Sequence, residues 1–149
     1  VKTSDLQFAV DSTWASLGAT TKNFVVRTGY LDLSMGAEGG YGFEGRADQD
    51  FTHLQWGALA GSLSLTIEHN PDAAAEVDAW RARTRRFVRV SASNGAKSLR
   101  FDLAGTYQQP PRFSRLDDTE VVTLVLTLDT DAASGKVLQA RVVNQLSGI

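Results

Sequence analysis

The chain has 149 residues, enough for one domain that buries a core of its own. Hydrophobic residues make up 42% of it, which excludes an intrinsically disordered chain. The net charge of −2 lacks the excess of Lys and Arg that a tight nucleic-acid binder needs, and the absence of cysteine excludes disulfides and thiolate metal sites. No apolar run reaches the length of a membrane span, so no contact with a membrane is expected. The sequence therefore predicts a single domain over residues 1–149.

The N-terminal third of the chain predicts two strands followed by a long loop. Residues 6–10 alternate between polar and apolar side chains, and residues 24–35 do so over a longer stretch. Residues 36–50 carry five glycines and four acidic residues against one arginine. Loops of this length in compact domains are usually functional or lack order. Two interpretations stay open: a surface loop without fixed structure, or an arm that becomes ordered against a neighbouring molecule.

One helix, predicted over residues 71–86, interrupts the strands. Asn70 is a suitable N-cap, and Pro71 suits the first helical position because its missing N–H costs nothing there. Acidic residues near its start and arginines near its end match the helix dipole. Val77 and Trp80 share one face at helical spacing, so they are the expected anchor of the helix on a sheet.

Strands flank this helix on both sides. The β-prone segments are residues 51–56 and 62–68 before the helix, and 87–92, 98–103, 119–130 and 137–145 after it. The sequence Ser93-Asn94-Gly95 predicts a tight hairpin, and Pro110-Pro111 predicts a loop. The expected fold class is mainly β with one helix: a β-sandwich or barrel of two antiparallel sheets with a single flanking helix.

No pattern of catalytic residues is present, so the chain is not expected to be an enzyme, and no cofactor or metal is expected. The two histidines, His53 and His69, lie in or just after predicted strands without the spacing of a metal site. The glycine-rich segment matches neither phosphate-binding fingerprint, and no Gly-x-Ser-x-Gly sequence occurs.

Aromatic residues near predicted loops and strand ends allow an alternative function. Exposed rings on a rigid sheet can stack on sugars, whereas the same rings could instead plug the ends of the domain. The residues concerned are Trp14, Tyr41, Trp56 and Tyr107. The alternative is a monomeric carbohydrate-binding or adhesin-like β-sandwich module.

Several stretches of the chain resemble the tail tube proteins, or major tail proteins, of long-tailed bacteriophages. The resemblance lies in the pattern of strands and helix over roughly two-thirds of the chain rather than in a signature motif. The stretches are residues 61–67, 72–90, 99–105, 117–129 and 136–144.

The resemblance implies a structural virion protein: a tail tube subunit, or a neighbouring tail part with the same sandwich, such as a terminator or distal tail protein. Members of that family fold as a β-sandwich with a flanking helix, and their subunits form rings, usually hexameric, that stack into a tube through which DNA passes. The implied partners are further copies of this chain, other phage tail proteins and, transiently and without sequence specificity, DNA in the lumen. The implied location is the phage tail, assembled in the host cytoplasm.

A tube role assigns candidate positions along a long hairpin. Residues 24–35 and 51–56 are expected to form part of the barrel wall, with polar side chains that face the lumen or a neighbouring subunit: Arg27, Asp32, Ser34, Thr52 and Gln55. The glycine-rich loop, at about residues 36–50, is expected to reach the next ring. Its candidate residues are Glu38, Tyr41, Phe43, Glu44, Arg46 and Asp48.

Overall fold

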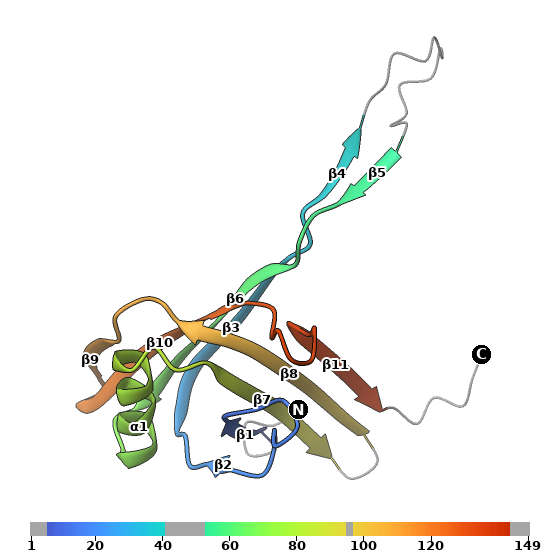
Figure 1. Cartoon of the computed structure of the whole chain (residues 1–149). Coiled ribbons are helices and arrows are strands. Elements are labelled where there is room, and N and C mark those ends of the chain that lie inside the picture. Colours follow the sequence, from blue (N-terminus) through green and yellow to red (C-terminus); the bar gives the residue numbers. More distant parts are fainter. Residues whose placement is uncertain (1–5, 41–52, 95–96, 144–149) are drawn as a thin grey trace.

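The computed structural model describes residues 6–40, 53–94 and 97–143, and in these ranges the chain is mainly β with one helix, as predicted (Figure 1). The elements are β1 (Leu6–Asp11), β2 (Thr21–Lys22), β3 (Val26–Ser34), β4 (Ala37–Gly40), β5 (His53–Trp56), β6 (Ala60–Glu68), α1 (Pro71–Arg81), β7 (Arg86–Asn94), β8 (Lys97–Tyr107), β9 (Arg112–Leu116), β10 (Thr119–Leu128) and β11 (Leu138–Val143). In the same ranges no helix has the length and apolar character needed to cross a membrane.

Nine strands form one antiparallel sheet in the order β2-β1-β7-β8-β10-β6-β3, with β11 beside β8 and β9 beside β10. The sheet is not closed, and the described residues do not form the two stacked sheets of the expected sandwich. The reason is β8, which pairs with β7 over most of its length and also, through Gly105–Tyr107, with Leu126–Leu128 of β10. This shared strand connects two halves of the sheet: β2, β1, β7, β8 and β11 form one half, and β9, β10, β6 and β3 form the other.

Both halves of the sheet contribute to one hydrophobic core. Phe8, Val88 and Leu103 come from β1, β7 and β8, and they belong to the same buried cluster as Ile67 of β6 and Leu124 of β10. A cavity of about 250 Å³ remains between the two halves. Each half therefore has one side toward the core and one side facing away from it.

Helix α1 begins as the sequence predicts. The side chain of Asn70 accepts a hydrogen bond of 2.9 Å from the backbone N–H of Ala73, and Pro71 occupies the first turn. Val77 is buried in the core, and Trp80 is partly buried against it. The helix thus lies on the core side of the sheet.

The helix ends at Arg81, five residues before the predicted end. Arg83 adopts a left-handed conformation, with a φ of 50°. Its backbone N–H donates to the carbonyl oxygen of Trp80, and the N–H of Thr84 donates to the carbonyl oxygen of Ala79, both at 3.0 Å. These two bonds form a Schellman motif, which closes the last turn of a helix. An arginine stands at the position that usually carries glycine, so no local signal in the sequence marks this end.

Strands β3 and β6 form a long hairpin that continues beyond the nine-stranded sheet, so the expected pairing of residues 24–35 with residues 51–56 is wrong. Past Ser34 and Ala60, β4 and β5 pair as a short two-stranded sheet, which Figure 1 shows extending away from the body of the molecule. Ala37–Gly40 are therefore a strand inside the segment that was expected to be a loop. Strand β9 was not expected either, because it directly follows Pro110-Pro111.

Candidate assembly surface

The side of β3, β6 and β10 that faces away from the core is rich in hydroxyl groups. Leu63, Leu65 and Ile67 point into the core, so the residues between them point to the opposite side. On that side, the hydroxyl groups of the three strands and the carboxylate of Asp32 all belong to side chains that are at least partly exposed. We call this surface the hydroxyl face, and it consists of Thr28, Tyr30, Asp32, Ser34, Ser62, Ser64, Thr66, Thr123 and Thr127.

Charge on the hydroxyl face is sparse. Asp32 is the one carboxylate of this set, and Glu68 of β6 lies on the same side at the end of the strand. The hydroxyl oxygens of Thr66 and Thr123 lie 2.9 Å apart in a cross-strand hydrogen bond. At one end of the face, a register shift between Val26 and Thr28 marks a bulge that contains Arg27. The guanidinium of Arg27 lies 2.6 Å from the carboxylate of Glu68, so this cation is neutralised within the chain.

The strands that border the hydroxyl face have free edges. Among the strands of the described ranges, β3 pairs only with β6, and β9 pairs only with β10. All five residues of β9 are exposed. Phe113 in this strand is 61% exposed and contacts His69, with ring centroids 5.8 Å apart. Such edges present unpaired backbone groups on which another strand can add.

The other half of the sheet carries arginines on its outward side. Arg89 donates two hydrogen bonds to Asp102, at 2.6 and 3.0 Å, and Arg100 Nε lies 3.2 Å from the same carboxylate. Asp102 is almost completely buried. The hydrogen bond to Asp102 raises the pKa of the Arg89 guanidinium, although burial acts against it. Because these charges satisfy one another, the cluster stabilises the sheet rather than forming an open anion site.

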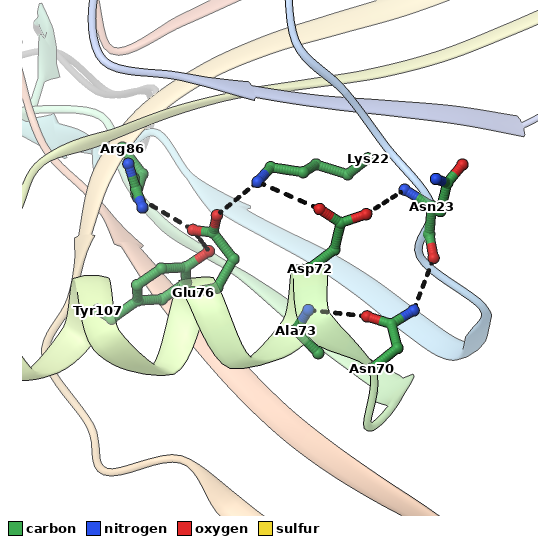
Figure 2. A network of polar contacts seen from close by, with 8 residues as sticks. All are labelled: Lys22, Asn23, Asn70, Asp72, Ala73, Glu76, Arg86 and Tyr107. Atoms are coloured by element: carbon green, nitrogen blue, oxygen red, sulfur yellow. Dashed lines mark hydrogen bonds and ion pairs between the residues drawn. The ribbon is translucent and has the colours of Figure 1, made fainter.

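A buried carboxylate joins the helix to the sheet (Figure 2). Glu76 has no exposed surface, and its oxygens lie 3.0 Å from Arg86 Nε, 3.6 Å from Lys22 Nζ and 3.2 Å from the hydroxyl of Tyr107. Burial and then the charge of Glu76 raise the pKa of Tyr107 well above its ordinary value. The sequence indicated only that Glu76 lies near the helix start, since its partners are distant in the chain.

The first turn of α1 also holds the segment that leads into β3. Asp72 accepts a 2.9 Å hydrogen bond from the N–H of Asn23 and lies 3.5 Å from Lys22 Nζ. The side chain of Asn70 donates a 2.8 Å hydrogen bond to the carbonyl of Asn23. Figure 2 shows these contacts running from the helix to the chain just before β3. The helix therefore positions the start of a strand that borders the hydroxyl face.

The candidate residues from the sequence fall into three groups. Asp32 and Ser34 lie on the hydroxyl face, with Arg27 in the bulge beside it. Gln55 is in β5 and Glu38 is in β4, paired with each other in the projecting sheet. The remaining candidates lie outside the described residues: Tyr41, Phe43, Glu44, Arg46, Asp48 and Thr52.

Of the four aromatic candidates for a sugar platform, the two whose side chains the structure describes, Trp14 and Tyr107, do not form a free platform. Tyr107 is buried, and the Trp14 ring has Lys136 Nζ 5.4 Å from its centre and Phe87 against its edge. Trp56 lies in the projecting strand β5, and Tyr41 lies outside the described residues. Within those ranges there is also no group of three or more His, Cys, Asp or Glu side chains that could hold a metal ion.

Comparison with known proteins gives a match in structure alone. No known family profile and no curated protein matches the sequence. Seven solved chains match the fold. One is a subunit of the SPP1 tail tube, solved by solid-state NMR and cryo-electron microscopy. It matches with a TM-score of 0.59 and 11% identity, over 99% of this chain and 81% of that chain. The similarity to tail tube proteins suggested by the sequence is thus confirmed at the level of the fold.

Proposed function

We propose that this protein is a structural subunit of a phage tail tube, which assembles into stacked rings through which DNA passes. The observation that carries the proposal is the four-stranded segment β9-β10-β6-β3. It combines a hydroxyl-rich outward face on β10, β6 and β3 with a free strand edge on each side. The shared fold with the SPP1 tail tube subunit supports the same conclusion.

Ring closure follows from the two free edges. The β9 edge of one copy pairs with the β3 edge of the next, so each contact joins two different surfaces, and such contacts generate rings when the rotation closes. Between β9 and β3 lie three successive antiparallel pairings, so these two strands run in opposite directions. The joint between copies is then antiparallel like the rest of the sheet, and the exposed edges become covered.

The hydroxyl face lines the lumen in this arrangement. Four strands per copy give a hexamer 24 strands, and a spacing of ~4.8 Å makes a barrel roughly 37 Å across before strand tilt widens it. A surface that holds phosphate tightly needs several free Lys or Arg side chains. The outward side of these strands instead offers mainly hydroxyl groups, and its few charges include Asp32, Arg112 of β9, and Arg27, which is paired with Glu68. DNA can therefore slide along it without being held.

The projecting sheet of β4 and β5 gives the assembly a second type of contact. It continues the same hairpin that borders the lumen and extends beyond the nine-stranded sheet. We assign to it, and to the loop candidates beyond Gly40, contacts with the next ring in the stack. The protein then belongs to the virion, its partners are its own copies and other tail proteins, and it needs neither a catalytic site nor a cofactor.

Electron microscopy of the purified full chain tests this function, with light scattering at rising protein concentration as a second measurement. We expect rings or tubes whose central channel is wide enough for a DNA duplex. A protein that stays a monodisperse monomer at every concentration contradicts the proposal. A specific hit on a glycan array that is lost in Trp56→Ala would favour the carbohydrate-binding alternative instead.

A further inference from the structure

We propose that neighbouring copies join in one defined register, in which Arg112 of β9 lies opposite Asp32 of β3 and Phe113 lies opposite Leu31. This inference rests on the proposed ring, and it names the residue pairs that make the joint specific. It places Arg112–Leu116 of one copy beside Thr28–Asp32 of the next.

The two faces of the sheet restrict which residues can be paired. Phe113 pairs with Val122, which points into the core, so Phe113 and Arg115 lie on the core side of β9. On β3, Leu31 pairs with Leu63 and also lies on the core side. A slip of one residue would exchange the faces, so allowed registers differ by two residues.

The register shifted by two residues toward the bulge is disfavoured by charge and by the bulge itself. It puts Phe113 opposite Gly29 and carries the pairing into the irregular part of β3. Arg115 then lies opposite Arg27, and like charges directly opposite each other destabilise a strand pair.

The register shifted by two residues away from the bulge leaves charges without partners. It puts Phe113 opposite Leu33, and Arg112 then faces Ser34 while Asp32 faces Ser114. Neither Arg112 nor Asp32 forms an ion pair within the described ranges, and both side chains are exposed. Only the proposed register brings these two opposite charges together.

The proposed register also makes use of apolar surface on both edges. Phe113 is 61% exposed in the single chain, and Leu31 is partly buried at the rim of the core. Their contact extends the core across the joint, and aromatic–aliphatic pairs of this kind stabilise neighbouring strands. The pairing stops at Thr28, next to the bulge, so all five residues of β9 are used.

Cysteine cross-linking of the assembled full chain tests the register, because the native sequence has no cysteine. Residues directly opposite have Cβ atoms about 4.5–5.5 Å apart, near the separation that a disulfide accepts, whereas diagonal neighbours are about 7–8 Å apart. Mild oxidation of Phe113→Cys/Leu31→Cys should give a ladder of covalent oligomers on a non-reducing gel. The matched pairs Phe113→Cys/Leu33→Cys and Phe113→Cys/Gly29→Cys should give none.

Each alternative outcome has a defined meaning. A ladder from the Leu33 or Gly29 pair, with tubes still present, overturns the register and leaves the tube function standing. A ladder from the pair Leu31→Cys/Val142→Cys shows that β3 joins β11 of the next copy instead of β9. If the unmodified protein forms neither rings nor tubes, the proposed function itself fails.

Charge reversal gives an independent test that does not depend on disulfide geometry. Asp32→Arg and Arg112→Asp should each raise the concentration needed for assembly several-fold, and the double variant should restore it. Asp78→Arg on the exposed side of α1 is the control and should leave assembly unchanged. All variants should keep the circular dichroism spectrum of the parent chain. A double variant that assembles no better than the singles contradicts the pairing.

Discussion

Tyr107 donates a hydrogen bond of 3.2 Å to Glu76, a carboxylate that has no exposed surface. The contact joins α1 to the end of β8, at one of the three residues that pair with β10. A buried carboxylate is stable only when cations and donors satisfy it, and here Arg86 and Lys22 complete the set. The cluster therefore couples the helix to the part of the sheet where its two halves meet.

Removing the hydroxyl of Tyr107 should destabilise the protein moderately, and removing Glu76 should do so more strongly. Tyr107→Phe leaves Glu76 with its cations, so we expect a loss of about 1–2 kcal/mol in the free energy of unfolding. Glu76→Ala leaves Arg86 without its carboxylate and Lys22 with Asp72 alone, and it should cost about 3–5 kcal/mol. Denaturant titration measures both. Asp78→Ala, an exposed carboxylate of the same helix, is the control and should change stability by less than about 0.5 kcal/mol.

Stability should fall at alkaline pH because of Tyr107. Its folded-state pKa is raised by burial and by Glu76, so the folded protein holds the phenol proton more tightly than the unfolded chain. The stabilisation is fully present below about pH 10, the ordinary pKa of tyrosine, and is lost as the pH rises toward the folded-state value. Unfolding curves between neutral and alkaline pH should show a smaller decline in Tyr107→Phe than in the parent. Equal declines in the two proteins would contradict this assignment.

Glycine at the end of the helix should stabilise the protein. Arg83 has a φ of 50°, a conformation that costs a side-chain-bearing residue about 1 kcal/mol and costs glycine almost nothing. We expect Arg83→Gly to raise the free energy of unfolding by about 0.5–1 kcal/mol in thermal or chemical unfolding. Arg81→Gly, two residues earlier at the last residue of the helix, should lower it instead, by up to about 1 kcal/mol. If both changes destabilise equally, the helix does not end in this motif.

The junction between β8 and β10 should not tolerate a side chain at Gly105. A Cβ atom there would lie 2.3 Å from the backbone carbonyl oxygen of Thr127, so the two strands would have to separate. Gly105→Ala should cost about 2–3 kcal/mol in denaturant unfolding. Thr106→Ala, the neighbouring residue on the same strand, should cost less than about 1 kcal/mol. A neutral Gly105→Ala would show that the strands are further apart than described.

The start of the helix and most strands were predictable because their signals are local. Asn70 and Pro71 carry the capping chemistry in the sequence itself, and the alternation of residues 62–68 reports directly which side faces the core. The end of the helix was not predictable, since Arg83 adopts its left-handed conformation without the glycine that usually indicates it. Strand β9 was missed because its five exposed residues show no apolar pattern, and the preceding prolines suggested a loop.

Contacts between distant parts of the chain could not be deduced in this way. Alternation tells which face of β8 is buried, but not that its last three residues pair with β10 and unite both halves in one sheet. The partners of Glu76 come from β2, β7 and β8, and nothing in its own neighbourhood marks it as buried. The hydroxyl face likewise appears only once the register of β3, β6 and β10 is known, although Asp32 and Ser34 were selected from sequence as polar hairpin positions.

The even number of strands from the β9 edge to the β3 edge has a consequence for the size of the proposed ring. An even count lets antiparallel order continue from copy to copy, whatever their number, so strand direction alone does not select six members over five or seven. The diameter must then be set by the curvature that each copy contributes, and the Arg27 bulge is where the edge strand departs from regular pairing. Changes at that irregularity would be expected to produce populations of mixed width rather than a loss of polymerisation.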